Sequence, residues 1–229
     1  ILNNILSIRS TTGLSTDVFM DGQNTHRVML IQNGADVTLN GFSIVNGLAT
    51  GNNYAAGIAI NAANTVLDLS EMIISGNVND YSSSHGGAIS VETGSTANIS
   101  HTLIAGNRAQ LGAGVYGSGY VLIRDSVFRD NQSIYKSPYG LGAAIFIDGY
   151  KDYNWPKAYV ENTSFINNWS HNYGGAIEND RGYVTLNNCL FVDNSNNQLG
   201  TYSNQYGGAI CNYAGYTNIL NSTFSRNSG

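Results

Sequence analysis

The chain has 229 residues, a formal net charge of −5 at pH 7 and only 11% charged residues, with its Lys and Arg residues scattered along the sequence. It contains no basic stripe for nucleic acid or an anionic membrane, and no apolar stretch approaches transmembrane length. No break in composition suggests a linker, so we expect residues 1–229 to form one elongated domain.

The first 35 residues contain apolar side chains, such as Ile8, Phe19 and Leu30, but no repeated motif, and we expect a divergent first coil over 1–35. From residue 36 to 229 two motifs alternate. The first is Phe or Ile followed three residues later by Asn, at Ile74–Asn77, Ile104–Asn107, Phe128–Asn131, Phe165–Asn168, Phe191–Asn194 and Phe224–Asn227. The second is a cluster of small residues that ends in Ile or Val, at Ala56–Ile58, Gly86–Ile89, Gly112–Val115, Gly142–Ile145, Gly174–Ile177 and Gly207–Ile210.

The period of these motifs predicts a solenoid, in which each unit buries its apolar face against its neighbours. The closing Ile or Val recurs every 26 to 33 residues. Between the motifs, polar and apolar residues alternate, as in Val37–Asn40 and Val184–Asn187, which is typical of strands. Parallel crossovers are right-handed. We therefore predict an all-β fold, a right-handed single-stranded parallel β-helix of about seven to eight coils without helices.

Aligning the repeats on their Phe or Ile predicts which residues stack. The position five residues upstream is always Leu, Ile or Val, as at Leu39 and Ile123. The position three residues upstream is mostly polar and suits a tight corner, because Asn and Asp tolerate the left-handed conformation. This corner column is Gly41, Glu71, His101, Asp125, Asn162, Asn188 and Asn221. The residues that we assign to the structural repeat are Ile89, Asn107, Phe128, Asn131, Phe165, Asn168, Ile177, Phe191, Asn194, Ile210, Phe224 and Asn227.

The alternating motifs resemble the repeat of the polymorphic outer membrane proteins, known from chlamydial surface autotransporters, which alternates Gly-Gly-Ala-Ile/Leu/Val with Phe-x-x-Asn. The resemblance spans about residues 36–229. It implies a β-helical passenger domain that is extracellular or displayed on a cell surface and often serves in adhesion, and it does not imply a catalytic site. Terminal coils need a cap, and the last repeat stops after Asn227. We therefore expect a fragment, a processed product or a subunit that a neighbour caps.

Loops after the motifs carry the candidate binding residues, because the variation in repeat length is concentrated there. They cover 47–55, 78–85, 132–140, 195–206 and 148–157, and we expect them along one side of the rod. Tyr beside Asn, Ser and Gly suits recognition of a glycan or a surface protein. The alternative is that the Tyr side chains only pack the loops onto the rod. The predicted ligand-binding residues are Tyr54, Tyr81, Tyr135, Tyr139, Tyr150, Tyr153, Trp155, Tyr173, Tyr202 and Tyr206.

A Gly-Tyr pair also opens three predicted strands, at Tyr120, Tyr183 and Tyr216, and predicts a ladder of Tyr rings on one face. Cys189 and Cys211 are 22 residues apart, which is less than any step between coils, so we favour two buried free thiols over a disulfide. No His or Cys pair has the spacing of a zinc site, and we expect no metal or cofactor.

Two other functions stay open. The first is a polysaccharide lyase or glycoside hydrolase, which would need a group of carboxylates and bases. The candidates are Glu71, His101, Arg124, Asp125 and Glu161 near the corner column, and Glu178, Asp180 and Arg181. We disfavour an enzyme because the corner column continues as Asn, which a structural role explains. The second is a filament in which copies of the rod associate end to end.

Overall fold

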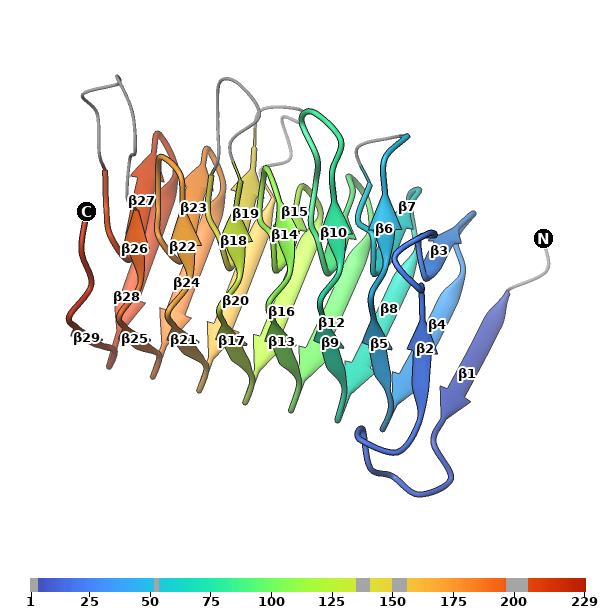
Figure 1. The fold of residues 1–229 in the computed structure, drawn as a ribbon. Helices are drawn as coiled ribbons and strands as arrows, with labels where there is room; N and C mark the ends of the chain where they lie inside the picture. Colours follow the sequence, from blue (N-terminus) through green and yellow to red (C-terminus); the bar gives the residue numbers. More distant parts are fainter. Residues whose placement is uncertain (1–3, 52–53, 135–140, 150–155, 197–205) are drawn as a thin grey trace.

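The computed structural model describes residues 4–51, 54–134, 141–149, 156–196 and 206–229, and its regular structure there is β-strand throughout. The strands form four parallel sheets, named A to D, and each full coil visits them in the order A, B, D, C. Successive coils lie side by side from the N-terminal to the C-terminal end of the rod (Figure 1). The predicted all-β solenoid of stacked parallel coils is confirmed, while its right-handed winding and the single domain over 1–229 stay predictions.

Sheets A and B are the two larger sheets, and their strands follow one another along the rod in chain order. Sheet A contains β1 (Ile5–Arg9), β4 (Asp36–Asn40), β8 (Val66–Ser70), β12 (Thr96–Ser100), β16 (Tyr120–Arg124), β20 (Lys157–Glu161), β24 (Tyr183–Asn187) and β28 (Tyr216–Leu220). Sheet B contains β2 (Phe19–Asp21), β5 (Ser43–Val45), β9 (Ile73–Ser75), β13 (Leu103–Ala105), β17 (Val127–Arg129), β21 (Ser164–Ile166), β25 (Leu190–Val192) and β29 (Thr223–Ser225).

The other two sheets hold the remaining strands. Sheet C contains β3 (Met29–Gln32), β7 (Ile58–Asn61), β11 (Ile89–Val91), β15 (Val115–Gly117), β19 (Ile145–Asp148), β23 (Ile177–Asp180) and β27 (Ile210–Tyr213). Sheet D contains β6 (Leu48–Ala49), β10 (Val78–Asn79), β14 (Arg108–Ala109), β18 (Gln132–Ser133), β22 (Trp169–Ser170) and β26 (Ser195–Asn196).

The stacking predicted from the repeat alignment is confirmed by the strand register. Ile74 pairs with Ile104, and Phe128 pairs with Phe165. The Phe128, Phe165 and Phe191 rings are fully buried, and the Phe165 and Phe191 centroids lie 4.7 Å apart with an interplanar angle of 7°. In sheet A the buried and less buried residues alternate, as period-two side-chain direction requires. The core is therefore a set of columns that run along the rod.

The corner between sheets A and B has the conformation that the sequence predicts. Its residues have φ values between 47° and 76°, in the left-handed region, at Gly41, Glu71, His101, Asp125, Asn162, Asn188 and Asn221.

The small-residue motif marks another tight site, the connection from sheet D to sheet C. At Gly174 φ is 55°, and a Cβ would stand 2.1 Å from the carbonyl oxygen of Ile177. A side chain at this position would therefore collide with the backbone, which explains the Gly.

The Asn of the Phe-x-x-Asn motif forms a ladder of side-chain hydrogen bonds inside the rod. The Nδ2 atom of Asn131 donates to Oδ1 of Asn168 at 3.0 Å, and the backbone N–H of Asn131 donates to the same oxygen at 3.2 Å. Nδ2 of Asn168 also donates to the carbonyl oxygen of Phe128 at 3.0 Å. The ladder joins Asn77, Asn107, Asn131, Asn168, Asn194 and Asn227. Each Asn satisfies buried backbone groups of the neighbouring coil, which gives the motif a structural role.

Both Cys residues are free thiols, as predicted. Cys189 is buried, whereas Cys211 is only half-buried. Within the ranges that the structure describes, no helix has the length and apolar character to cross a membrane.

Candidate functional site

The loop tyrosines that the structure describes are Tyr54, Tyr81, Tyr173 and Tyr206. The other predicted binding residues, Tyr135, Tyr139, Tyr150, Tyr153, Trp155 and Tyr202, lie outside the described residues. The four described residues all belong to connections from sheet D to sheet C. The chain makes this connection at an equivalent point of successive coils, so the loops are arranged along the rod.

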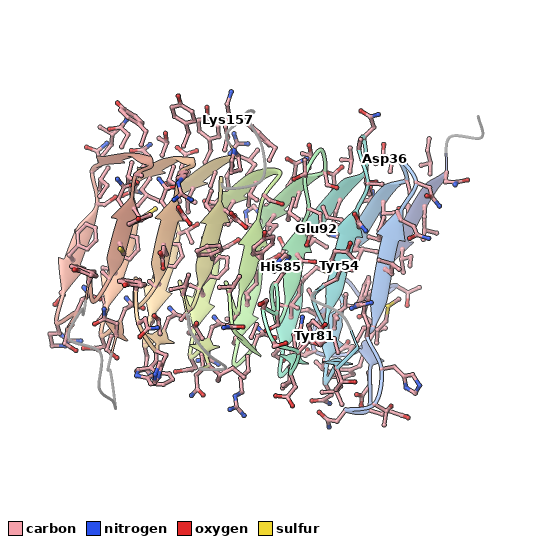
Figure 2. All side chains as sticks on the ribbon, turned by 90° about the horizontal axis from the view of Figure 1, so that it is seen from above. Asp36, Tyr54, Tyr81, His85, Glu92 and Lys157 are labelled. Carbon is pink, nitrogen blue, oxygen red and sulfur yellow. The ribbon has the colours of Figure 1, made fainter. Side chains whose placement is uncertain are left out.

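The structure brings two loop tyrosines together and keeps two separate. Tyr173 and Tyr206 form a parallel bridge, and their rings stack with centroids 5.3 Å apart. Tyr206 is 49% exposed and Tyr81 is 39% exposed, whereas Tyr173 and Tyr54 are half-buried. Figure 2 shows Tyr81 on the opposite side of the rod from Lys157. Tyr81 and Tyr206 are therefore the described loop tyrosines most open to a partner.

The outer face of sheet C is covered by these connections and forms a second, smaller core. Tyr116 and Phe146 point outward from β15 and β19 but are buried, and Leu141 packs with them. Tyr173 packs against this cluster, so at this position a loop tyrosine holds a connection onto the rod. His85 stacks on Tyr116 with ring centroids 3.8 Å apart. The sequence did not predict this cluster, because its members come from two different positions of the repeat.

The covered face of sheet C also contains buried polar groups. His85 Nδ1 lies 3.1 Å from Oε1 of Glu92, and the two residues lie close together in Figure 2. The hydroxyl of Tyr116 donates to Oδ2 of Asp148 at 2.6 Å. Burial is the main cause that raises the Tyr116 pKa far above its ordinary value, and the negative charge of Asp148 adds to it. This pair is therefore a fixed hydrogen bond at neutral pH, in which the phenol keeps its proton.

Glu178 pairs with Cys211 across β23 and β27 and is more deeply buried than Glu92 and Asp148. Its side chain is nearly inaccessible, with 4% of the residue exposed, and its Oε2 atom has no hydrogen-bond partner among the residues that the structure describes. Burial raises the pKa of Glu178 well above its usual range, and the nearby Asp180 carboxylate adds to the shift. Burial, together with Glu178 and Asp180, raises the Cys211 pKa to about 12. At neutral pH the Cys211 thiol is therefore protonated.

The outer face of sheet A carries a different set of aromatic residues. Tyr120, Tyr159, Tyr183 and Tyr216 are between 38% and 60% exposed. We name these four residues and Lys157 the tyrosine face. The Tyr120 and Tyr159 rings have centroids 5.8 Å apart, and those of Tyr183 and Tyr216 are 5.9 Å apart; both pairs are tilted. This surface lies on the side of the rod opposite to Tyr81 (Figure 2).

The predicted ladder of Tyr120, Tyr183 and Tyr216 is interrupted. Tyr183 pairs with Tyr216, but Tyr120 pairs with Lys157, which in turn pairs with Tyr183. Pro156 and Lys157 stand where the other repeats have Gly-Tyr, so a Lys occupies the register position. Tyr159, two residues further along β20, was missed because it lies outside that pair. Aligning the outward positions of the repeats in the same way as the inward ones would have found it.

The residues considered for catalysis lie in two separate places. At the corner column, His101 Nε2 lies 3.8 Å from Oδ2 of Asp125, and Nδ2 of Asn162 donates to Oδ1 of Asp125 at 3.0 Å. Arg124 Nε lies 3.7 Å from Oε2 of Glu161. These groups are partly exposed and pair with the equivalent residue of the next coil, so they stabilise the stack of coils.

The second group lies at the end of β23. Arg181 Nη1 lies 3.2 Å from Oδ1 of Asp180, and the Arg181 guanidinium lies 5.5 Å from the centre of the Tyr213 ring. Burial raises the pKa of Asp180, although Arg181 opposes that shift. In the part of the chain that the structure describes, no group of three or more His, Cys, Asp or Glu is arranged to hold a metal ion.

Comparisons with known proteins bear on the repeat. Curated protein sequences and solved structures gave no match to the chain. Residues 162–180 match the Chlamydia polymorphic membrane protein repeat. This segment runs from the corner residue Asn162 through Phe165 and Asn168 to the small-residue cluster before Ile177, and so includes both motifs. With its stacked parallel coils, the chain is a parallel β-helix that carries a repeat of the polymorphic membrane protein type.

Proposed function

We propose that the chain is a secreted or cell-surface adhesive rod, which binds a glycan or a surface protein through the loop tyrosines. The observation that carries this proposal is the position of Tyr81 and Tyr206. Both are exposed, and both lie in connections from sheet D to sheet C, where variation in repeat length is concentrated. An exposed Tyr supplies rigid contact area with one polar end, at low cost in conformational entropy.

Two further findings support the proposal. The match to a membrane-protein repeat favours a place at the surface of a cell. The rod itself is rigid: the Asn ladder and the stacked Phe rings tie each coil to the next. A rigid scaffold that presents variable loops is a common arrangement for binding proteins, because the loops can differ without disturbing the core.

The test is adhesion of beads that carry the full chain, measured on immobilised glycans and on cell surfaces. We expect Tyr81→Ala combined with Tyr206→Ala to reduce adhesion, with an unchanged circular dichroism spectrum. Tyr213→Ala is the matched control, because Tyr213 is at least as exposed but lies at the end of β27 rather than in these connections. Adhesion that survives the double substitution would refute the role of the loops.

End-to-end association of copies is the second candidate, and one observation favours it. The outermost coils leave apolar side chains of the inward columns exposed, including Leu6 at one end and Ile219 and Phe224 at the other. These are the side chains that a further coil would cover, because each column of the core continues along the rod axis. Sedimentation velocity over a range of concentrations tests this function: growth of the particles with concentration supports it, and a constant monomer contradicts it.

A further inference from the structure

The tyrosine face is a second exposed aromatic surface, and the function proposed for the loops does not account for it. We propose that it binds an anionic polysaccharide, whose chain lies along the rod axis. The site is made of Tyr120, Tyr159, Tyr183 and Tyr216, with Lys157 among them. It goes beyond the proposed function, because it names a different face of the rod and a ligand of defined charge.

The first argument is that the fold does not require these residues. Column 1 of the outer face of sheet A begins with Ile5, Asp36, Val66 and Thr96 and continues with Tyr120, Lys157, Tyr183 and Tyr216. Column 2, which contains Tyr159, begins with Ser7, Thr38, Asp68 and Asn98. The same backbone therefore forms the same sheet with aliphatic, small polar or acidic side chains at these positions. The four exposed Tyr residues in the C-terminal half of this face therefore need an explanation other than strand formation.

The second argument is geometric. In parallel sheets neighbouring strands lie about 4.8 Å apart, so equivalent side chains recur at that interval along the rod. The tilted pairs of rings, 5.8 Å and 5.9 Å apart, are not stacked flat on one another, so ring surface stays open to a ligand. The face of an aromatic ring carries partial negative charge and attracts the C–H groups of a sugar ring. Two pairs of open rings, with Lys157 in the row between Tyr120 and Tyr183, suit a polymer that presents several sugar rings along the rod.

The third argument concerns charge. Among the described residues Lys157 has no ion-pair partner, whereas the neighbouring Arg124 lies 3.7 Å from Glu161. Lys157 stands in the row between Tyr120 and Tyr183. The rest of the chain has a net negative charge, and the other half of this face carries Asp36 and Asp68. A polysaccharide with carboxylate or sulfate groups is therefore attracted to this half of the face and repelled by the other half.

The test uses the full chain on three immobilised polymers: polygalacturonate, dextran sulfate and uncharged dextran. We expect retention on an anionic polymer and little on dextran, and the two anionic arms distinguish carboxylate from sulfate recognition. Tyr159→Ala combined with Tyr183→Ala should weaken binding about tenfold, since each ring contributes contact with a sugar. Lys157→Gln should weaken binding at low salt and reduce its dependence on salt concentration.

Two matched controls separate this site from the loops. Tyr81→Ala removes a Tyr of similar exposure on the opposite side of the rod, and Thr96→Ala changes column 1 in the other half of the face; neither should alter retention. Equal retention on dextran, no retention on either anionic polymer, or full retention by the Tyr159 and Tyr183 double variant would each overturn the proposal. Loss of retention with Tyr81→Ala would also overturn it, while supporting the loops. If the double variant unfolds, Lys157→Gln, which changes only an exposed side chain, still decides the question.

Discussion

The two halves of the rod have the same backbone but different side chains, and the change occurs at the same coil in two sheets. In sheet B the inward column is Ile at Ile44, Ile74 and Ile104, and becomes Phe from Phe128 onward. On the outer face of sheet A the first aromatic residue is Tyr120, which belongs to the same coil as Phe128. The inward change replaces one apolar residue with another, whereas the outward change introduces aromatic rings where the other half has Ile5, Asp36, Val66 and Thr96.

This difference distinguishes the positions at which the solenoid requires an apolar side chain from those at which it accepts several residue types. An inward position must be apolar because it is fully buried, and both Ile and Phe meet that requirement. The outward positions of sheet A accept Asp, Thr, Tyr or Lys without a change of register. Side chains on the inward columns are therefore fixed by stability. Those on the outer face are free to serve binding, which is why we place a ligand site there.

The largest expected effect comes from the inward Phe column. Phe165→Ala leaves a cavity between two stacked rings and should cost roughly 3–5 kcal/mol, while Ile74→Ala in the other half should cost roughly 2–5 kcal/mol. Unfolding by urea, followed by circular dichroism, measures both. An unchanged unfolding curve for Phe165→Ala would contradict the stacking of the Phe rings.

The next effect concerns the Asn ladder, which crosses both halves. Asn131→Ala removes the acceptor of the Asn107 backbone N–H and of the Asn107 side-chain amide, and leaves them buried. The expected loss of stability is roughly 1–3 kcal/mol. Asn218→Ala on the outer face of sheet A is the control and should change stability by no more than about 0.5 kcal/mol. If both substitutions cost the same, the ladder does not stabilise the rod.

A smaller effect should appear as a dependence of stability on pH. The folded state raises the pKa of Glu178 above its ordinary value of 4.5, through burial and then the charge of Asp180. Its stabilising contribution is therefore complete below about pH 4.5 and is lost as pH rises through the pKa of the folded state. Glu178→Gln should raise the melting temperature at pH 7 relative to the parent chain and make little difference at pH 4. If the melting temperatures of the parent chain and of Glu178→Gln differ by the same amount at pH 4 and at pH 7, ionisation of Glu178 is not coupled to folding.

The smallest effect on stability should come from the tyrosine face. Tyr159→Ala removes an exposed ring and should change the free energy of unfolding by less than about 1 kcal/mol. Thr96→Ala is its counterpart in the other half and should do the same. A much larger loss for Tyr159→Ala would mean that the ring is part of the fold, and would weaken the case for a ligand.

The sequence alone was sufficient to predict the buried interior of the rod. The spacing of Phe165 and Asn168, and the polar residue at Asn162, predict a buried strand, its partner in the next coil and a left-handed corner. These features follow from the period of the repeat, since every coil must satisfy the same steric and hydrogen-bonding conditions as its neighbour.

The outer surfaces could be predicted only in part. Lys157 interrupts the expected Tyr ladder because outward positions are not bound by packing, and nothing in the repeat motif specifies them. The covered face of sheet C was missed for another reason. Tyr116 and His85 come from different positions of the repeat, and their contact depends on how a loop folds back over the strands. Loop paths are set by tertiary contacts that sequence spacing does not encode.

The most direct measurement is hydroxyl-radical footprinting of the tyrosines, with and without polygalacturonate or dextran sulfate. We expect one of these polymers to protect Tyr159 and Tyr183 on the tyrosine face from the radicals, while Tyr81 on the opposite side keeps its reactivity. Unchanged reactivity of Tyr159 and Tyr183 with both polymers, or protection confined to Tyr81 and Tyr206, would contradict it.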